Sequence, residues 1–237
     1  MKKKTFLFYA VLSVLLSSCS SNIDETKVDT SSESELILKG KKFARVHNEC
    51  LDYIYENTHK PQTRATNKVN GDLFSDIVDT ANSFIAEKVA KTRTTSDGTM
   101  YVTKEMYDSI TIEDIKAQMS PIELEYTNMA VENINCIESL INQVAYDAPE
   151  LSDIQKQAVI CFLTTLESSL EYWQENIDKW KSDSDVGAQT RGHFEFNWKE
   201  VAFADAYWGY TGMLSSGLNV YVGGGAAAVG SAFACLK

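Results

Sequence analysis

The side chains most able to do chemistry are scattered along this 237-residue chain. The three histidines, His47, His59 and His193, lie far from one another and from any cysteine in the sequence. They form no HExxH or similar ligand spacing, and the Ser-x-x-Lys, Gly-x-Ser-x-Gly and Walker patterns are absent. The sequence therefore predicts no catalytic residue, no cofactor-binding residue and no metal ligand, and we expect a non-enzymatic protein.

Among the five cysteines, Cys19 has the most informative neighbours. Three lysines follow Met1, an apolar run covers Phe6 to Leu16, and the sequence Leu16-Ser17-Ser18-Cys19 comes at once. The apolar run is much shorter than the ~20 residues of a membrane-spanning helix, so residues 1–18 are predicted to be a signal peptide. The whole run resembles the signal peptide and lipobox of bacterial lipoproteins.

This resemblance implies that Cys19 becomes the first residue of the mature chain and carries a lipid. Two or three acyl chains together bind a membrane stably, because each buries many methylene groups. Ser20 and Ser21 lack the aspartate that retains enteric lipoproteins in the inner membrane. The resemblance therefore implies a cell-envelope protein anchored through Cys19, with the outer membrane as the favoured location.

The charge of the chain is unevenly distributed. The net charge of −11 becomes −14 when the three lysines of residues 2–4 are removed with the signal peptide. From Arg191 onward, three basic and three acidic residues balance, so the negative charge lies in residues 20–190. An acidic body repels phosphates, which argues against a nucleic-acid partner.

The middle of the chain has the periodicity of amphipathic helices. Apolar residues recur every three or four positions in Leu36–Glu56 and again in Asp72–Lys91, while the polar, proline-containing stretch Asn57–Asn70 reads as a loop. Thr103 and Thr111 are positioned to cap short helices. The sequence predicts an all-α helical bundle.

Two capping boxes predict an antiparallel helix hairpin inside this bundle. Ser120-Pro121-Ile122-Glu123 is expected to open one helix whose apolar face runs to Val144 and includes Asn133. Ser152-Asp153-Ile154-Gln155 is expected to open a second helix that runs to Trp180. The connection between them is short, so the two helices should be antiparallel neighbours.

The four remaining cysteines form no CxxC pair. Cys136 and Cys161 lie at the same distance in sequence from the turn of the expected hairpin. At equal rise per residue they would face each other, which makes a Cys136–Cys161 disulfide a candidate outside the cytoplasm. The alternative is a contact between two small buried thiols.

The C-terminal segment 194–237 is apolar and rich in glycine. Ala206–Leu236 contains no charged residue, and it holds seven of the 12 glycines. Alternation at Phe194–Trp198 and the residues Leu218–Val222 are compatible with short strands. We consider two structures for this segment: a glycine-rich helical hairpin or strand pair folded against the acidic body, or a membrane-active segment presented by it.

The second structure rests on a compositional resemblance. The Tyr207-Trp208-Gly209-Tyr210 sequence, the Gly223-Gly224-Gly225 triplet and the small residues around them resemble the glycine-rich segment of class II bacteriocins. The segment is not cationic and has no double-glycine leader, unlike those peptides. Under this alternative, cleavage near Arg191, in a polar stretch suited to proteolysis, would release Gly192–Lys237.

These observations divide the chain into five parts. We expect a signal peptide at 1–18, a flexible polar tether at 19–35, a helical domain at 36–181, a linker at 182–193 and the apolar segment at 194–237. The predicted function is a lipid-anchored, non-enzymatic envelope protein that presents an apolar C-terminal segment. The alternative is the precursor of a membrane-active, bacteriocin-like peptide.

Overall fold

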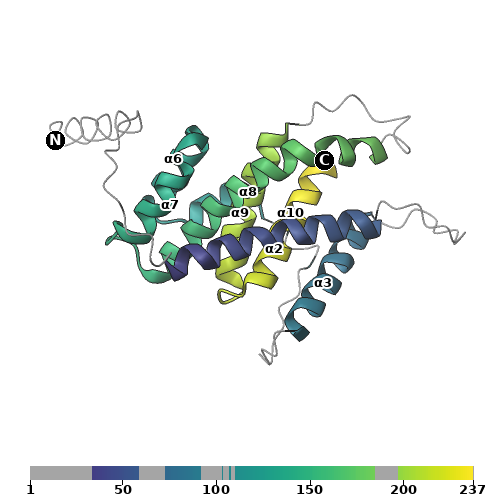
Figure 1. The fold of residues 1–237 in the computed structure, drawn as a ribbon, viewed down its shortest axis with the longest axis horizontal. Helices are drawn as coiled ribbons and strands as arrows, with labels where there is room; N and C mark the ends of the chain where they lie inside the picture. The colour runs from purple at the N-terminus through teal and green to yellow at the C-terminus, as the bar shows by residue number, and fades with distance from the viewer. Residues whose placement is uncertain are drawn as a thin grey trace, which may run out of the picture. The chain divides into compact units, whose positions relative to one another are not determined.

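The fold is known from a computed structural model that describes residues 34–58, 73–91, 103, 107, 110–184 and 197–236. Within these ranges all regular secondary structure is helical, so the predicted all-α fold is confirmed. Residues Ser34–Lys237 form one compact unit. In chain order, the helices are α2 (Glu35–Thr58), α3 (Leu73–Lys91), α5 (Ile112–Gln118), α6 (Pro121–Glu132), the 3₁₀ turn η1 (Ile134–Cys136), α7 (Ile137–Tyr146), α8 (Asp153–Ser184), α9 (Trp198–Ser215) and α10 (Val220–Leu236) (Figure 1).

The predicted helix starts are present as hydrogen-bonded caps. The Ser120 hydroxyl accepts from the Glu123 amide at 3.3 Å, and a Glu123 carboxylate oxygen accepts from the Ser120 amide at 2.8 Å. Thr111 opens α5 with the same reciprocal arrangement. At Ser152, the amide donates to the Gln155 side-chain oxygen at 3.1 Å. Each cap satisfies amides that a helix leaves without an intrahelical partner, which fixes where the helix begins.

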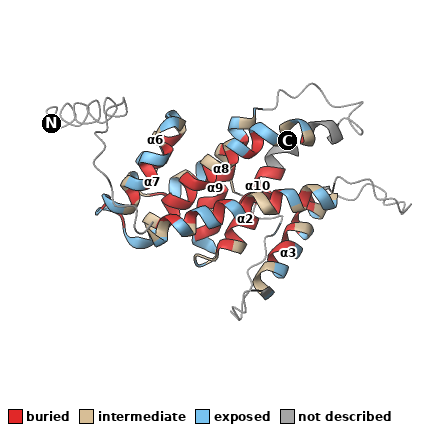
Figure 2. Cartoon of the chain, in the orientation of Figure 1, coloured by how far each residue is buried: buried red, intermediate tan, exposed pale blue. Residues whose placement is uncertain are grey.

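The centre of the unit is the first half of α8, where every residue from Gln157 to Leu166 is buried (Figure 2). Helix α8 packs against α2, α6, α7 and α9, and α10 packs against α2, α3 and α9. The chain therefore buries α8 from several sides, whereas α2 and α7 each keep an exposed face. None of the helices in the described part combines the length and apolar character that crossing a membrane requires.

The expected single helix from Ile122 to Val144 is wrong, because the chain breaks at Asn133. Asn133 has φ −140° and ψ 87°, and its side-chain oxygen accepts from the Asn135 amide at 3.3 Å. An asparagine side chain that bonds nearby backbone competes with helical hydrogen bonds. The break separates α6 from α7 by the turn η1 and leaves Asn133 exposed, where the apolar pattern had placed it on the buried face.

The expected strand at Leu218–Val222 is also wrong. Gly217 and Leu218 have φ values of 61° and 69°, which turn the chain sharply after α9. The Asn219 side-chain oxygen then accepts from the amides of Tyr221 and Val222 at 3.0 and 3.3 Å, which starts α10. At the other proposed extended piece, residues 194–196 lie outside the described ranges, and Trp198 is the first residue of α9.

The apolar C-terminal segment folds as a helical hairpin, α9 and α10, against the rest of the unit. Every residue from Val222 to Ala232 is buried. The expectation that the protein presents this segment is therefore corrected: the glycine-rich helix lies in the core. Of the two structures considered from the sequence, the hairpin folded against the body is the one observed.

Glycine makes this burial feasible because α10 approaches its neighbours closely. A Cβ atom on Gly212 of α9 would lie 2.8 Å from the carbonyl oxygen of Gly223 of α10. On Gly230 it would lie 2.5 Å from the Cγ atom of Trp208. Real Cβ atoms do not approach so closely, so the two helices can pack at this separation only with glycine at these positions.

We expect Gly212→Ala to destabilise the protein by about 1–3 kcal/mol, because the new methyl group meets rigid backbone of α10. Denaturant unfolding followed by circular dichroism measures this loss. The matched control is Gly217→Asn in the α9–α10 turn: no atom lies within 4 Å of its Cβ, and asparagine tolerates the positive φ. Equal stability losses in the two variants would contradict the close-packing argument.

Candidate functional site

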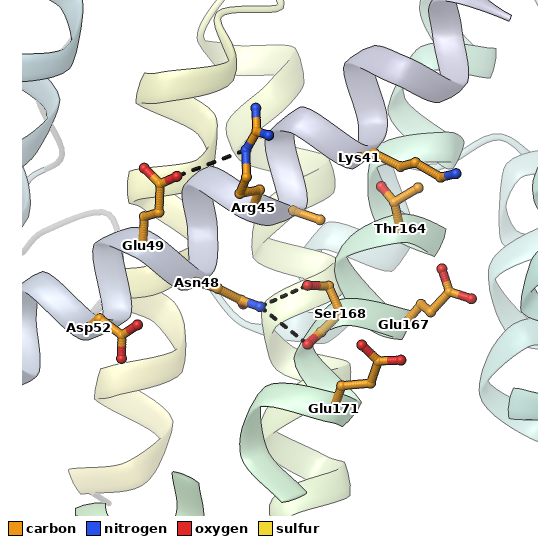
Figure 3. Close-up of a pocket in the computed structure, with 10 residues that line it drawn as sticks. Lys41, Arg45, Asn48, Glu49, Asp52, Thr164, Glu167, Ser168 and Glu171 are labelled. Carbon is orange, nitrogen blue, oxygen red and sulfur yellow. Dashed lines mark hydrogen bonds and ion pairs between the residues drawn. The ribbon is translucent and has the colours of Figure 1, made fainter. Parts of the chain in front are cut away.

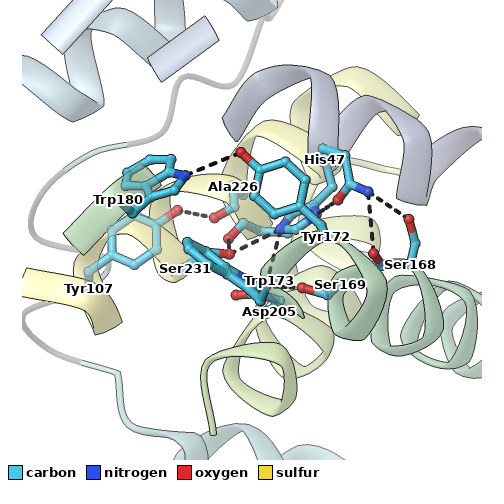
Figure 4. Close-up of polar contacts among 12 residues, drawn as sticks. His47, Tyr107, Ser168, Ser169, Tyr172, Trp173, Trp180, Asp205, Ala226 and Ser231 are labelled. Atoms are coloured by element: carbon cyan, nitrogen blue, oxygen red, sulfur yellow. Dashed lines mark hydrogen bonds and ion pairs between the residues drawn. The ribbon is translucent and has the colours of Figure 1, made fainter. Parts of the chain in front are cut away.

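The most unusual group of side chains is a fully buried polar cluster where four helices meet (Figure 4). It consists of His47 from α2, Ser169 and Trp173 from α8, Asp205 from α9 and Ser231 from α10, and each is 0% exposed. We call these five residues the polar cluster. Because buried polar atoms are costly unless they are hydrogen-bonded, their partners decide what the cluster does.

Asp205 is the acceptor at the centre of the cluster. Its Oδ2 atom accepts from the Trp173 indole nitrogen at 2.8 Å and from the Ser169 hydroxyl. Its Oδ1 atom has no hydrogen-bond partner among the described residues. Asp205 therefore ties α9 to α8 through one oxygen, while the other oxygen is desolvated without compensation.

One ring nitrogen of His47 faces the polar cluster, and the other faces Asn48, which lies outside the cluster. The Nδ1 atom lies 2.8 Å from Asn48 Oδ1, and the Asn48 amide nitrogen donates to the Ser168 hydroxyl at 2.8 Å. Since that donation fixes the orientation of the amide, we assign the hydrogen of neutral His47 to Nδ1. The Nε2 atom faces Ser231 Oγ at 3.0 Å and Asp205 Oδ2 at 3.6 Å.

Burial shifts both titrating groups toward their neutral forms. It lowers the pKa of His47, although the nearby Asp205 acts in the opposite direction. It raises the pKa of Asp205, although the nearby His47 and the hydrogen bonds from Ser169 and Trp173 act against the rise. Both directions follow from the poor solvation of charge in the core, and they favour a neutral imidazole in the folded protein.

A histidine, an aspartate and a serine together raise the question of nucleophilic catalysis. In a catalytic triad, the acid and the hydroxyl lie at opposite nitrogens of the imidazole. Here Asp205 and Ser231 both face Nε2, and Asn48 occupies Nδ1. The cluster is also enclosed, so this geometry suits a hydrogen-bonded clamp on four helices rather than attack on a substrate.

The second candidate is an open groove between α2 and α8, with a volume of about 330 Å³ (Figure 3). Its lining is almost entirely polar or charged. The residues that line it are Lys41, Ala44, Arg45, Asn48, Glu49 and Asp52 from α2, and Thr164, Glu167, Ser168 and Glu171 from α8.

Several charges of the groove are already compensated. Glu49 pairs with Arg45 at 3.9 Å and with Lys88 of α3, and Asp52 pairs with Lys179 at 3.5 Å. Glu167 has a raised pKa, caused first by burial and then by Glu171 and Glu138. No three potential metal ligands converge within the described ranges. The groove therefore suits contact with a polar or charged surface better than it suits chemistry.

The site residues expected from the sequence fall in different places. Cys19 and Arg191 lie outside the described residues, so lipidation and cleavage remain predictions. Cys136 ends η1, where its sulfur accepts from the Asn133 side chain at 3.0 Å. Cys161 is buried on α8 beside Phe43 and Met213, and burial raises the pKa of its thiol to about 12.

Cys136 and Cys161 are not joined by a disulfide in this structure. The pairing was expected from two straight helices with equal rise on each side of the turn. The break at Asn133 and the turn η1 interrupt the first of these helices just before α7. Helix α7 still separates Cys136 from the turn without a break, so the pairing stays a prediction.

The polar cluster was not predicted from the sequence. His47 lies far from the other histidines in sequence, but it follows Phe43 by four residues on the predicted apolar face of α2. That position signals burial, and a buried histidine requires partners. Asp205 is the last acidic residue before the uncharged segment, but Ser231 has no feature that distinguishes it from other serines.

No protein-family model, curated protein or solved structure matches this chain.

We expect His47→Gln to make stability less sensitive to acid. In the wild type, the folded-state pKa of His47 is lowered, so below its unfolded value of ~6.5 the unfolded chain binds the proton more readily. Stability attributable to His47 is thus present above this pH and lost as pH falls, by at most about 1.4 kcal/mol per pH unit. Gln cannot take up this proton.

The free energy of unfolding of both proteins is measured in denaturant at several pH values from about 7.5 to about 5. This range brackets the unfolded-state histidine pKa of ~6.5. Subtracting the two curves removes the common titration of surface carboxylates. Thr127→Val, which changes a buried polar residue that does not titrate, is the control and should give a curve parallel to the wild type. A parallel curve for His47→Gln would refute the assignment of a neutral buried imidazole.

Proposed function

We propose that this protein is a lipid-anchored, non-enzymatic component of the bacterial cell envelope, held at the outer membrane by acyl chains on Cys19. The observation that carries the proposal is the N-terminal sequence: basic residues, a short apolar run and Leu16-Ser17-Ser18-Cys19 in immediate succession. Each part has a separate role in export and lipidation, and the three occur in the required order.

The fold is consistent with attachment at the N-terminus. The compact unit begins at Ser34, which follows Cys19 by 15 residues. At the other end of the chain, the apolar residues Val222–Ala232 are buried against α2, α3 and α9. The most apolar segment thus has a structural role in the core, and the proposed lipid supplies the membrane attachment.

The non-enzymatic part of the proposal is supported by where the reactive side chains lie. His47, Asp205 and Ser231 are all enclosed: His47 hydrogen-bonds Ser231, and Asp205 accepts from Trp173 and Ser169. The open groove presents charged side chains, several of them already in ion pairs. These features favour a protein that acts by binding or by position.

The alternative function, release of a membrane-active Gly192–Lys237 peptide, is opposed by the same burial. Release requires α9 and α10 to leave the core, which breaks the Asp205–Trp173 hydrogen bond and exposes the apolar residues of α10. Exposing apolar surface costs roughly 25 cal/mol per Å², so the hairpin should remain bound after cleavage.

We expect the wild-type protein expressed in its bacterial host to incorporate an alkyne-labelled fatty acid and to partition with membranes. Cys19→Ser should lose the label and the membrane association, because the thiol is the proposed attachment point. Cys136→Ser is the matched control and should keep both. Label on Cys19→Ser, or a wild-type protein that is soluble with an unmodified Cys19, would refute the proposal.

We expect the C-terminal hairpin to stay in place when the chain is cut before it. A recognition sequence for a specific protease is inserted after Arg191, the protein is cleaved, and the products are separated by size-exclusion chromatography without denaturant. The two fragments should elute together and separate only in denaturant. Free Gly192–Lys237 peptide that permeabilises lipid vesicles would favour the bacteriocin-like alternative instead.

A further inference from the structure

The outward face of α2 is basic, in contrast to the acidic chain that surrounds it. Leu38, Lys41, Lys42 and Arg45 are all exposed, and their spacings of three and four place them on one side of the helix. Between Glu35 and Glu49, α2 contains four basic residues and no carboxylate. We call the exposed residues Leu38, Lys41, Lys42 and Arg45 the α2 basic face.

Exposed apolar side chains gather near the same end of α2. Leu38 is 52% exposed and belongs to the face itself. Tyr146 is 57% exposed, and its hydroxyl accepts from the amide of Ser34 at 3.1 Å. Ile154 is 57% exposed and lies one turn before Gln157, which donates to the Leu36 carbonyl oxygen. Three of the four large hydrophobic residues that are exposed in the described part therefore surround the start of α2.

Another aromatic residue supports the face from α10. The Lys42 ammonium lies 5.0 Å from the centre of the Tyr221 ring, which is half-buried. Tyrosine rings and lysine side chains are the residues that favour the boundary between lipid and water. The α2 basic face thus combines positive charge with exposed apolar and aromatic groups.

Acidic residues lie near the face in two places, along the groove between α2 and α8 and at one end of the unit. Glu49 is paired with Arg45 and with Lys88. Glu167 of α8 lies across the groove from Lys41 (Figure 3). The exposed carboxylates at the end of the unit are those of Glu35, Asp147, Glu150 and Asp153. Because the latter four lie at the helix ends, they surround one end of the face. The carboxylates of Glu49, Asp52, Glu167 and Glu171 line the groove beside Lys41 and Arg45. Between Glu35 and Glu49, the charged side chains of α2 itself are all basic.

The proposed lipid restricts how far this face can be from a membrane. Ser34 follows Cys19 by 15 residues, so the two are at most about 50 Å apart when the chain is fully extended. Helix α2, with 24 residues, is about 36 Å long. A lipid on Cys19 would therefore keep the α2 basic face at a high local concentration near the membrane, where even a weak attraction is effective.

We propose that the α2 basic face docks on the anionic phospholipid headgroups of the membrane that holds the lipid of Cys19. The lysines and Arg45 contact phosphate groups, Leu38 enters the interface, and α2 lies along the membrane surface. This proposal rests on the proposed lipid anchor and adds an orientation for the folded unit: α2 faces the membrane.

The test is chemical labelling of lysine amines in the full-length mature protein, read by mass spectrometry. The lipidated protein is placed in vesicles containing phosphatidylglycerol, in vesicles of phosphatidylcholine alone, and in micelles of a non-ionic detergent. Labelling of Lys41 and Lys42 should slow at least fivefold in the phosphatidylglycerol vesicles. Lys199, an exposed residue at the start of α9, is the internal control and should react equally in all three.

A variant shows whether the face itself causes the protection. Leu38→Ser combined with Arg45→Glu leaves both reporter lysines in place and should abolish most of their protection, whereas Lys199→Glu should not change it. Circular dichroism confirms that each variant is folded. Equal labelling in vesicles and micelles, equal protection by both lipids, or unchanged protection in the double variant would each overturn the proposal.

Failure of docking and failure of lipidation are distinguishable. The mass of the N-terminal peptide reports the lipid on Cys19 independently of lysine labelling. A lipidated chain with unprotected lysines contradicts the docking proposal alone. A chain without lipid contradicts the proposed anchor, and with it the membrane orientation that depends on that anchor.

Discussion

The fold depends on the close approach of α10 to its neighbours. Glycine at 223, 224 and 225 brings the α10 backbone near α9, α2 and α3 in turn, because a Cβ atom at these positions would meet Gly212, Val46 and Ile85. Close approach increases the dispersion contacts of the surrounding apolar side chains and removes the space in which water would solvate backbone. The same composition that resembles a membrane-active peptide thus serves the packing of a protein core.

This packing explains why the polar cluster can exist. Helix α10 packs against α2 and α9, which carry His47 and Asp205, and contributes Ser231 to the cluster. A buried carboxylate is unfavourable, and one of its oxygens lacks a partner in the described structure. The hydrogen bonds from Trp173 and Ser169 offset part of that cost. What the cluster adds is specificity, because its hydrogen bonds join side chains from four helices in one arrangement.

The parts of the fold that the sequence predicted are those governed by local physics. The capping boxes at Ser120 and Ser152 mark helix starts through atoms three residues apart, and the apolar periodicity of α2 and α3 defines their buried faces. The break at Asn133 was missed because a polar residue at an apolar position was interpreted as part of a continuing helix. The strand expected at Leu218–Val222 was wrong because Gly217, Leu218 and Asn219 form a turn and a cap. The polar cluster depends on pairing across as many as 184 residues of sequence, which no local pattern encodes.

The contacts between α10 and α2 also constrain how the protein reaches its folded state. Its contacts with α2 join the two ends of the compact unit, and the His47–Ser231 hydrogen bond closes a loop of 184 residues. Contacts this distant in sequence form late, because the entropy of closing the loop must be lost before they contribute. The core is therefore incomplete until α10 has been synthesised and can pack against α2, α3 and α9. A chain of this design completes its core only after α10 is made, which is compatible with the export before folding that the proposed lipid anchor requires.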